Sequence, residues 1–266
     1  MADARAHVTK NDVVAGLRRL GVEDGTFLFV HAAMGQLGQM EGGPEALLDA
    51  LQEAVGPKGT LALPGFSFQL KDEPEPVFDV RNTPTWASKV YEAFRQRPGV
   101  HRSHHVTHSV CAIGLRAAEL TATHSVNPCG EESPFRKLAP WGATIIFLGV
   151  SHNSNTTLHA VEEQERLPHI GYRLLEGATI IDETGQQYPI ASAAHDSSSQ
   201  YDFNRLNAQL DATGVQHQIV IGDAIVRAVD ARGMYDLATE VVRRDPTALL
   251  KQGDTWMEIP VSTRQG

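Results

Sequence analysis

The sequence predicts a three-layer α/β/α fold, in which helices cover both faces of a mixed, largely parallel central sheet. Short, almost wholly apolar runs alternate with segments of helical periodicity through the early part of the chain. Continuous apolar runs are typical of strands that are buried on both faces, as they are in parallel sheets. Because the 266 residues show neither an internal repeat nor a shift in composition, we expect one domain over residues 1–266.

The N-terminal segments establish this alternation. A threonine and an aspartate at capping-box spacing predict a helix over residues 9–21, which ends at a glycine. Residues 26–30 are an apolar run that predicts a buried strand. A proline in the first turn and a glycine at the end predict a second helix over residues 44–56, and residues 60–63 predict the next strand.

The middle of the chain is less regular. Acidic residues and prolines indicate a loop over residues 69–83, and residues 121–135 are also rich in loop-forming residues. Between these loops we expect a helix over residues 84–97 and a strand over residues 109–113. The apolar residues 143–150 predict a further buried strand.

The last third of the chain predicts one hairpin and two helices. Residues 178–190 have a hairpin pattern with a glycine in the turn. Residues 191–200 are small and polar, and helical patterns follow near residues 222–232 and 235–243.

Composition restricts the classes of function. The chain has 23 Lys and Arg against 32 Asp and Glu, a formal charge of −9 that disfavours nucleic-acid binding. No apolar run approaches the roughly 20 residues of a membrane span, and the N-terminus lacks the apolar core of a signal peptide. The two cysteines fit a reducing compartment. We therefore expect a cytoplasmic protein without nucleic-acid or membrane partners.

Residues 155–162 are the most informative stretch. They follow the strand predicted at 143–150 and open a helix in which His159 and Glu162 are three residues apart, so the two side chains share one face. An imidazole beside a carboxylate suits proton transfer, although such a pair is more often a solvated helix face. Ligands of open α/β sheets bind beyond the carboxyl ends of strands, so we expect His31, Phe66 and His159 to converge on one crevice.

A second cluster spans residues 102–109 and contains one arginine, three histidines and three hydroxyl residues. Such a density of donors suits a phosphate, while the simpler interpretation is a polar loop before a strand. A metal-dependent hydrolase stays open as an alternative. Its ligands would be His108 with His104 or His105, and either His159 or His195. The chain has no His-Glu-x-x-His helix, no Gly-x-Ser-x-Gly elbow and no phosphate loop.

Eight motifs in order resemble the aminoglycoside 3-N-acetyltransferases of the antibiotic N-acetyltransferase family. They are VHAAM (30–34), GGPEAL (42–47), GTLALP (59–64), PGVHRSHH (98–105), THS (107–109), SP (133–134), LGV (148–150) and NTTLHAVE (155–162). The resemblance extends from about residue 11 to Leu250. It implies a fold distinct from the small GNAT acetyltransferase fold.

The resemblance implies acetyl transfer from acetyl-coenzyme A, without a metal, to the 3-amino group of an aminoglycoside, and hence antibiotic resistance. His159 would be the catalytic imidazole and Glu162 its supporting carboxylate, with Thr156 or Ser103 as a hydroxyl donor to the oxyanion. Residues expected at the coenzyme are His31, Ala32, Ala33, Met34, Phe66, Arg102, Ser103, His105, Val106 and Ser109. Residues expected at the acceptor, partly within a segment of about 165–203, are Asp72, Glu163, His195 and Asp196. The protein would be a monomer or a homodimer.

Three departures from the family pattern leave the acceptor open. Ala32 and Ala33 follow His31 where the family usually has two serines, and Val106 stands where it usually has proline. Residues 191–195 lack the carboxylates that related sequences often carry there. A family member that acetylates a different small amine, or a non-catalytic binder of coenzyme or antibiotic, therefore remains an alternative.

Overall fold

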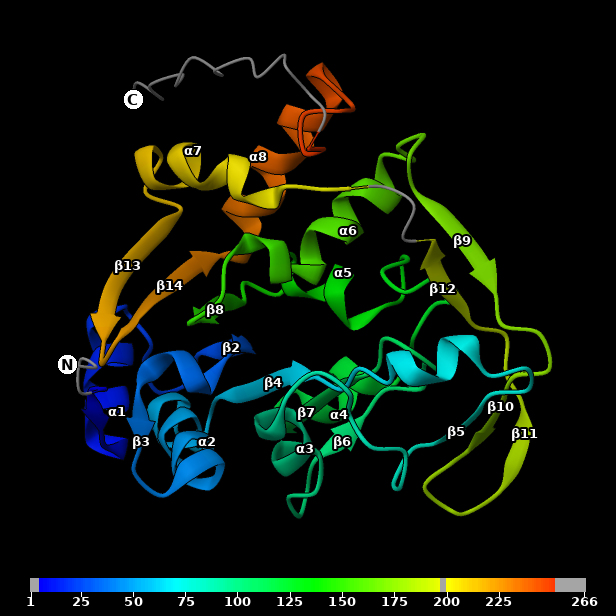
Figure 1. Ribbon diagram of the computed structural model, residues 1–266, viewed down its shortest axis with the longest axis horizontal. Helices are drawn as coiled ribbons and strands as arrows, with labels where there is room; N and C mark the ends of the chain where they lie inside the picture. Colours follow the sequence, from blue (N-terminus) through cyan, green and yellow to red (C-terminus); the bar gives the residue numbers. More distant parts are fainter. Residues whose placement is uncertain (1–4, 197–199, 252–266) are drawn as a thin grey trace.

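A mixed seven-stranded sheet forms the centre of the computed structural model, which describes residues 5–196 and 200–251 (Figure 1). The strand order is β13-β14-β8-β2-β4-β7-β6. The bounds are β2 (Phe27–Ala32), β4 (Thr60–Pro64), β6 (His101–Arg102), β7 (Val110–Gly114), β8 (Thr144–Leu148), β13 (Gln216–Ile221) and β14 (Ala224–Asp230).

Parallel pairing lies at the middle of this sheet. Strand β2 pairs in parallel with β4 on one side and with β8 on the other. The outer pairs β4–β7, β7–β6, β8–β14 and β14–β13 are antiparallel. All strands except β7 and β14 therefore run in one direction. The carboxyl ends of β2, β4 and β8 meet at one edge of the sheet, as the apolar runs predicted.

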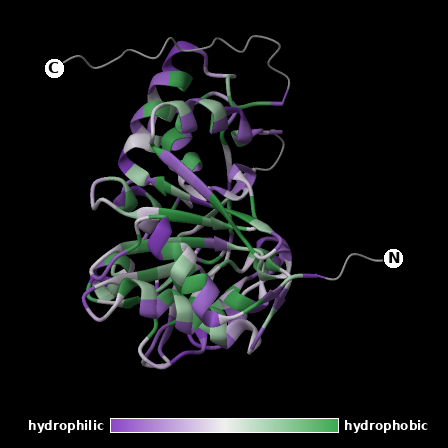
Figure 2. Cartoon of the chain, turned by 90° about the vertical axis from the view of Figure 1, so that its left-hand side faces the viewer, coloured by the Kyte–Doolittle hydropathy of each residue, from purple (hydrophilic) through white to green (hydrophobic). Residues whose placement is uncertain are grey.

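Helices cover both faces of the sheet, which confirms the predicted α/β class. One face carries α1 (Lys10–Arg19), α2 (Gly43–Val55) and α3 (Lys89–Arg95). The other carries α4 (Ala117–Thr121), α5 (Pro134–Leu138), α6 (Thr156–Gln164), α7 (Asn207–Ala212) and α8 (Ala231–Arg244) (Figure 1). Successive β2 residues alternate between two cores, since Phe29 packs beneath α5 and Leu28 beneath α2. The hydropathy colouring shows apolar residues concentrated along the central strands (Figure 2).

Smaller elements build the wall beside the sheet. A three-stranded sheet joins β5 (Val77–Asp79), β10 (Thr179–Ile181) and β11 (Gln187–Pro189), and β9 (Gly171–Leu174) pairs with β12 (Ala193–Asp196). The pairing of β5 with β10 brings the loop-rich residues 69–83 against the segment 165–203. The remaining elements are β1 (His7–Val8), β3 (Gln39–Met40) and the 3₁₀ turns η1 (Met34–Leu37), η2 (Phe68–Asp72), η3 (His152–Ser154) and η4 (Phe203–Leu206).

Two predicted helices differ in the structure. The helical pattern near 222–232 is wrong, because β14 occupies Ala224–Asp230 and its alternate residues Ala224, Val226 and Ala228 pack into one core. The helix expected over 84–97 is shorter. It begins only after Ser88, whose hydroxyl accepts a hydrogen bond from the Val90 N–H. Within the described ranges, no helix is long and apolar enough to cross a bilayer.

Candidate active site

Helix α6 positions the main catalytic candidates beyond the carboxyl end of β8. The chain leaves β8 at Leu148, forms η3 and enters α6 at Thr156. Asn155 occupies the N-cap position, but its amide points inward, toward Nδ1 of His152 (3.3 Å) and Sδ of Met234 (3.0 Å). No side chain of the described residues therefore caps the first turn of α6. Its free N–H groups and the helix dipole favour negative charge at this end.

His159 and Glu162 form the predicted pair. Nδ1 of His159 lies 2.6 Å from Oε2 of Glu162, and Oε1 of the same carboxylate lies 3.0 Å from Nε2 of His169. The Glu162 side chain is fully buried, whereas His159 is 14% exposed. Burial alone would raise the pKa of Glu162, but the hydrogen bonds from the two imidazoles outweigh it and lower the pKa to about 2. Glu162 is therefore a carboxylate at neutral pH.

Aromatic rings enclose the His159 imidazole on several sides. The ring centroids of His195, Tyr201 and Phe203 lie 4.6, 5.0 and 5.1 Å from that of His159. Such packing restricts the rotamer of His159 and leaves its remaining exposed surface toward one opening.

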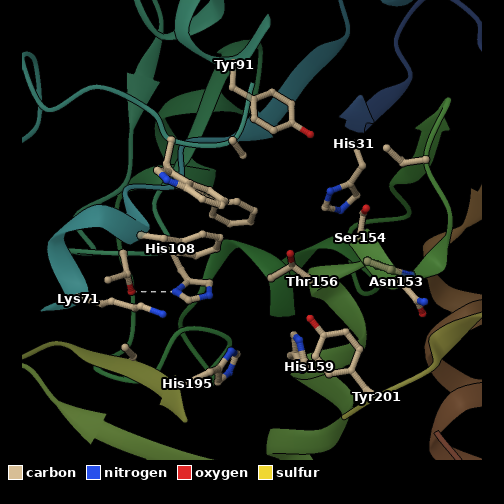
Figure 3. A pocket seen from close by; sticks show the side chains of 18 of the residues that line it. His31, Lys71, Tyr91, His108, Asn153, Ser154, Thr156, His159, His195 and Tyr201 are labelled. Carbon is tan, nitrogen blue, oxygen red and sulfur yellow. Dashed lines mark hydrogen bonds between the residues drawn. The ribbon is translucent and has the colours of Figure 1, made fainter. Parts of the chain in front are cut away.

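That opening is a cavity of about 630 Å³, shown in Figure 3. His31, Asn153 and Ser154 lie toward one end of it, while Lys71, His108 and His195 lie toward the other (Figure 3). Ala32, Ala33 and Asp72 also line the cavity. Thr156 and His159 lie between the two ends (Figure 3). The predicted convergence of His31, Phe66 and His159 at one edge of the sheet is confirmed.

His31 lines this cavity and has a buried ring nitrogen without a partner among the described residues. Its ring stacks on Phe147 at 5.4 Å, it is 1% exposed, and its Nε2 has no hydrogen-bond partner among the described residues. Burial, with a small contribution from His152, lowers the pKa of His31 to about 3. His31 is therefore neutral.

A second imidazole–carboxylate pair stands beside the first. Nε2 of His195 lies 3.0 Å from Oε1 of Glu163, which also accepts the Cys129 N–H at 2.9 Å. Burial lowers the pKa of His195 and outweighs the opposing effect of Glu163. Glu163 itself does not line the cavity and reaches it only through His195. Asp196 ends β12, and its side chain lies outside the described part of the structure.

Several residues expected at the coenzyme do not line the cavity, namely Met34, Arg102, Ser103, His105, Val106 and Ser109. Arg102 is 4% exposed and is used within the fold. Its guanidinium donates to Ser109 Oγ (2.9 Å) and to the carbonyls of Thr83 (2.6 Å) and Gly65 (2.7 Å). The hydrogen-bond donors that are concentrated in this segment of the sequence therefore hold neighbouring loops together, and their density alone does not distinguish this role from phosphate binding.

Comparison with known proteins now decides the family. The family model described as aminoglycoside 3-N-acetyltransferase matches residues 29–243. The chain belongs to the aminoglycoside 3-N-acetyltransferase family. It is an acyltransferase by this membership, and the resemblance seen in the eight motifs is confirmed.

Curated relatives cover nearly the whole chain. Aminoglycoside N(3)-acetyltransferase IV of Salmonella sp is 29% identical over 244 residues, which are 91% of this chain and 90% of that protein. Aminoglycoside N(3)-acetyltransferase VII of Streptomyces paromomycinus is 27% identical and covers 97% of this chain and 94% of its own length.

Solved structures agree with this assignment. The apoenzyme of aminoglycoside acetyltransferase AAC(3)-IVa has a TM-score of 0.79 at 27% identity and covers 93% of each chain. A binary complex of AAC-IIIb with CoASH has a TM-score of 0.77 at 26% identity and covers 90% of this chain and 98% of its own. A mutant of AAC(3)-IVa in complex with a gentamicin has a TM-score of 0.79 at 28% identity and covers 92% of each chain.

The histidines of the alternative hydrolase lie close together. The ring centroid of His108 lies 5.7 Å from that of His105 and 5.1 Å from that of His195, which in turn lies 4.6 Å from that of His159. Within the described ranges, the group with potential ligand atoms inside 4.8 Å is Cys129, Glu163 and His195, without His105 or His108. The hydrogen bonds of Glu163 to His195 and to the Cys129 N–H already account for this arrangement. Burial raises the pKa of the Cys129 thiol well above its usual value, so the group as it stands holds a thiol rather than a thiolate.

Sequence reasoning missed three polar residues that shape the site. Lys71, His169 and Tyr201 line the cavity. His108, which the sequence marked as a candidate metal ligand, lines the cavity as well. Lys71 and Tyr201 come from irregular segments without a motif, so only the tertiary fold brings them near His159. His169 lies seven residues after Glu162, and its spacing carries no helical signal because α6 has ended at Gln164.

Proposed function

We propose that the enzyme transfers an acetyl group from acetyl-coenzyme A to the 3-amino group of an aminoglycoside-type acceptor in a ternary complex. Such acetylation would confer resistance to the antibiotic. The observation that carries the proposal is the His159–Glu162 pair, held at 2.6 Å and opening into a cavity with two distinct ends. Family membership supports it, as do the names of relatives whose structures contain CoASH or a gentamicin.

The hydrogen bond to Glu162 selects the tautomer of the His159 ring. Because Glu162 is ionised, its Oε2 accepts a hydrogen bond that Nδ1–H of His159 donates. Nε2 then carries a lone pair and is the ring atom left to accept a proton from the acceptor amine as it attacks. A fixed imidazole is suited to this role, since its unperturbed pKa lies near neutral pH.

The reaction then balances in two steps. The acceptor ammonium group first loses one proton to solvent. The neutral amine then gives a second proton to Nε2 of His159 while its nitrogen bonds to the thioester carbon, which gives a tetrahedral oxyanion. The oxyanion collapses, the carbon–sulfur bond breaks, and the imidazolium returns the proton to the departing thiolate of coenzyme A. Glu162 stabilises the imidazolium that exists between these steps.

The start of α6 is suited to stabilise the oxyanion. Thr156 lines the cavity and begins α6, whose first N–H groups have no side-chain cap among the described residues. A hydroxyl and a helix N-terminus are both favourable partners for developing negative charge. The coenzyme would enter from the end with His31, Ala32 and Ala33. The acceptor would lie at the end with Asp72 and His195.

The test is release of free thiol from acetyl-coenzyme A in the presence of a panel of aminoglycosides, with mass spectrometry of the acetylated product. The proposal predicts acceptor-dependent thiol release and a mass increase of one acetyl group on nitrogen. Binding of coenzyme without any transfer to any amine would instead support the non-catalytic alternative.

A further inference from the structure

Tyr91 lies in α3, and its hydroxyl reaches the carboxyl end of β2. The phenol oxygen accepts a hydrogen bond from the N–H of Ala32, the last residue of β2, at 2.9 Å. Both residues line the cavity, and both belong to the core beneath α2. Figure 3 shows the Tyr91 ring with its oxygen directed toward the side of the cavity where His31 lies. A backbone contact therefore holds the Tyr91 hydroxyl at the end where the coenzyme is expected.

The Tyr91 hydroxyl has a proton to donate. The residue is 6% exposed, and burial raises its pKa to about 12 against a smaller opposing effect of the Ala32 N–H, so it is a neutral phenol at neutral pH. A phenol can accept one hydrogen bond and donate another at the same time. Within residues 5–196 and 200–251, the hydrogen bond that this hydroxyl makes is the one it accepts. Accepting it polarises the O–H group and makes it a better donor to a ligand.

The surroundings of this hydroxyl suit a neutral hydrogen-bond acceptor. The His31 ring is neutral, and Ala32 and Ala33 contribute no polar side-chain atom. An amide carbonyl oxygen is a good partner for a neutral phenol in such a site, whereas a phosphate is better matched by charged donors. The pantetheine arm of acetyl-coenzyme A carries amide carbonyls and joins the nucleotide to the thioester. This arm is therefore the part of the coenzyme that must run through the cavity toward His159.

We propose that Tyr91 is a coenzyme-binding residue, whose hydroxyl donates a hydrogen bond to an amide carbonyl oxygen of the pantetheine arm. This inference rests on the proposed function and adds a binding residue to the coenzyme end of the same cavity. Ala32 and Tyr91 pack into the same core, on one face of the central sheet. The phenol therefore supplies from α3 the hydroxyl that a serine at position 32 would supply from β2. This substitution accounts for coenzyme binding by a chain that has Ala32 where the family usually has serine.

The test is calorimetric binding of CoASH to Tyr91→Phe, which removes the hydroxyl and keeps the ring. One neutral hydrogen bond contributes about 1 kcal/mol, so the Kd for CoASH and the KM for acetyl-coenzyme A should both rise about fivefold. The kcat at saturating acetyl-coenzyme A should stay unchanged, because Tyr91 contacts the arm and not the reacting atoms. Tyr188→Phe is the matched control. Tyr188 lies in β11, outside the cavity lining, and its variant should bind CoASH as the parent does.

Ala32→Ser separates coenzyme binding from support of the fold, because Tyr91 also holds the end of β2. In the parent, Ala32→Ser should change the Kd for CoASH little, since the Tyr91 hydroxyl already occupies that space. In Tyr91→Phe, the added serine should recover most of the lost affinity, so the two substitutions are not additive. A lower melting temperature of Tyr91→Phe with an unchanged Kd would mean that the hydroxyl serves the fold alone, and the inference would be wrong. A raised Kd that Ala32→Ser does not recover would overturn it as well.

S-acetylpantetheine, which lacks the phosphates and the nucleotide, identifies the part of the coenzyme that Tyr91 contacts. If Tyr91→Phe raises the KM for S-acetylpantetheine by the same factor as that for acetyl-coenzyme A, the contact is with the pantetheine arm. If the effect is confined to acetyl-coenzyme A, the hydroxyl binds a phosphate or the nucleotide, and the inference is wrong. If no amine supports thiol release, the proposed function fails, but calorimetry with CoASH still decides this inference. Weaker binding to Tyr91→Phe than to Tyr188→Phe supports it, and equal binding, or no binding to the parent, refutes it.

Discussion

Nδ1 of His159 lies 2.6 Å from Oε2 of the fully buried Glu162, and this contact fixes which nitrogen of the imidazole faces the cavity. A neutral amide in place of the Glu162 carboxylate would stabilise the positive charge of the His159 imidazolium less. We therefore expect Glu162→Gln to lower kcat by about 100-fold, within the range typical of lost acid–base catalysis. The KM for acetyl-coenzyme A should hardly change. Steady-state kinetics at saturating acceptor measures both.

Glu163→Gln is the matched control for that variant. It removes a neighbouring carboxylate that contacts His195 and leaves the contact at His159 intact. We expect a smaller loss of kcat than for Glu162→Gln. The assignment of roles to the two glutamates would be reversed if Glu163→Gln proved the more damaging change.

The buried His31 should make the fold sensitive to mild acid. Burial lowers its pKa from 6.5 to about 3, so its contribution to stability is present above pH 6.5 and is lost as pH falls toward 3. At pH 5 the unfolded chain binds a proton that the native chain does not, which costs about 2 kcal/mol. The melting temperature of His31→Phe should therefore fall less between pH 7 and pH 5 than that of the parent. A parallel fall in both proteins would mean that His31 is not the titrating group.

Arg102 should support the fold rather than the coenzyme. Arg102→Met removes four hydrogen bonds from a buried guanidinium and leaves the carbonyls of Gly65, Val80 and Thr83 without this donor. We expect a loss of about 3 kcal/mol in the free energy of unfolding, measured by urea denaturation. The KM for acetyl-coenzyme A should stay unchanged in the folded fraction. A stable variant with a raised KM would restore the phosphate-binding role that the sequence suggested.

Restoring a hydroxyl at the coenzyme end should tighten coenzyme binding. Ala33 lines the cavity where the family usually has serine. One added neutral hydrogen bond contributes about 1 kcal/mol, so Ala33→Ser should lower the KM for acetyl-coenzyme A by about fivefold. Ala122→Ser, at an exposed position, serves as the control. An unchanged KM in both variants would place the coenzyme elsewhere in the cavity.

Local patterns predicted the elements that depend on local forces. The Thr9–Asp12 capping box starts α1 as expected, and the apolar runs became β2, β4 and β8 at the centre of the sheet. The pattern near 222–232 failed because a short run rich in alanine and valine suits either a helix or a strand. Its pairing with Ile145 and its neighbours on β8 decided for the strand.

Only the site residues that belong to a sequence motif could be predicted from the sequence. His159 and Glu162 are close in sequence, so their contact followed from helix geometry. Lys71 and Tyr201 lie in irregular segments. Because these segments have no helical or strand periodicity, the sequence does not indicate that the two side chains line the cavity. Arg102 was predicted at the site but is used within the fold. Its burial depends on carbonyls from distant segments, which the sequence pattern does not reveal. The division into a single domain, the cytoplasmic location and the oligomeric state stay predictions.

The most direct measurement is the rate of acetyl transfer by His159→Ala, together with calorimetric binding of acetyl-coenzyme A to the same variant. The loss of the base should lower kcat by about 10²–10⁴-fold, while coenzyme affinity and the melting temperature stay near those of the parent. Turnover close to that of the parent, in a variant that still binds the coenzyme, would contradict the role of His159 as the base.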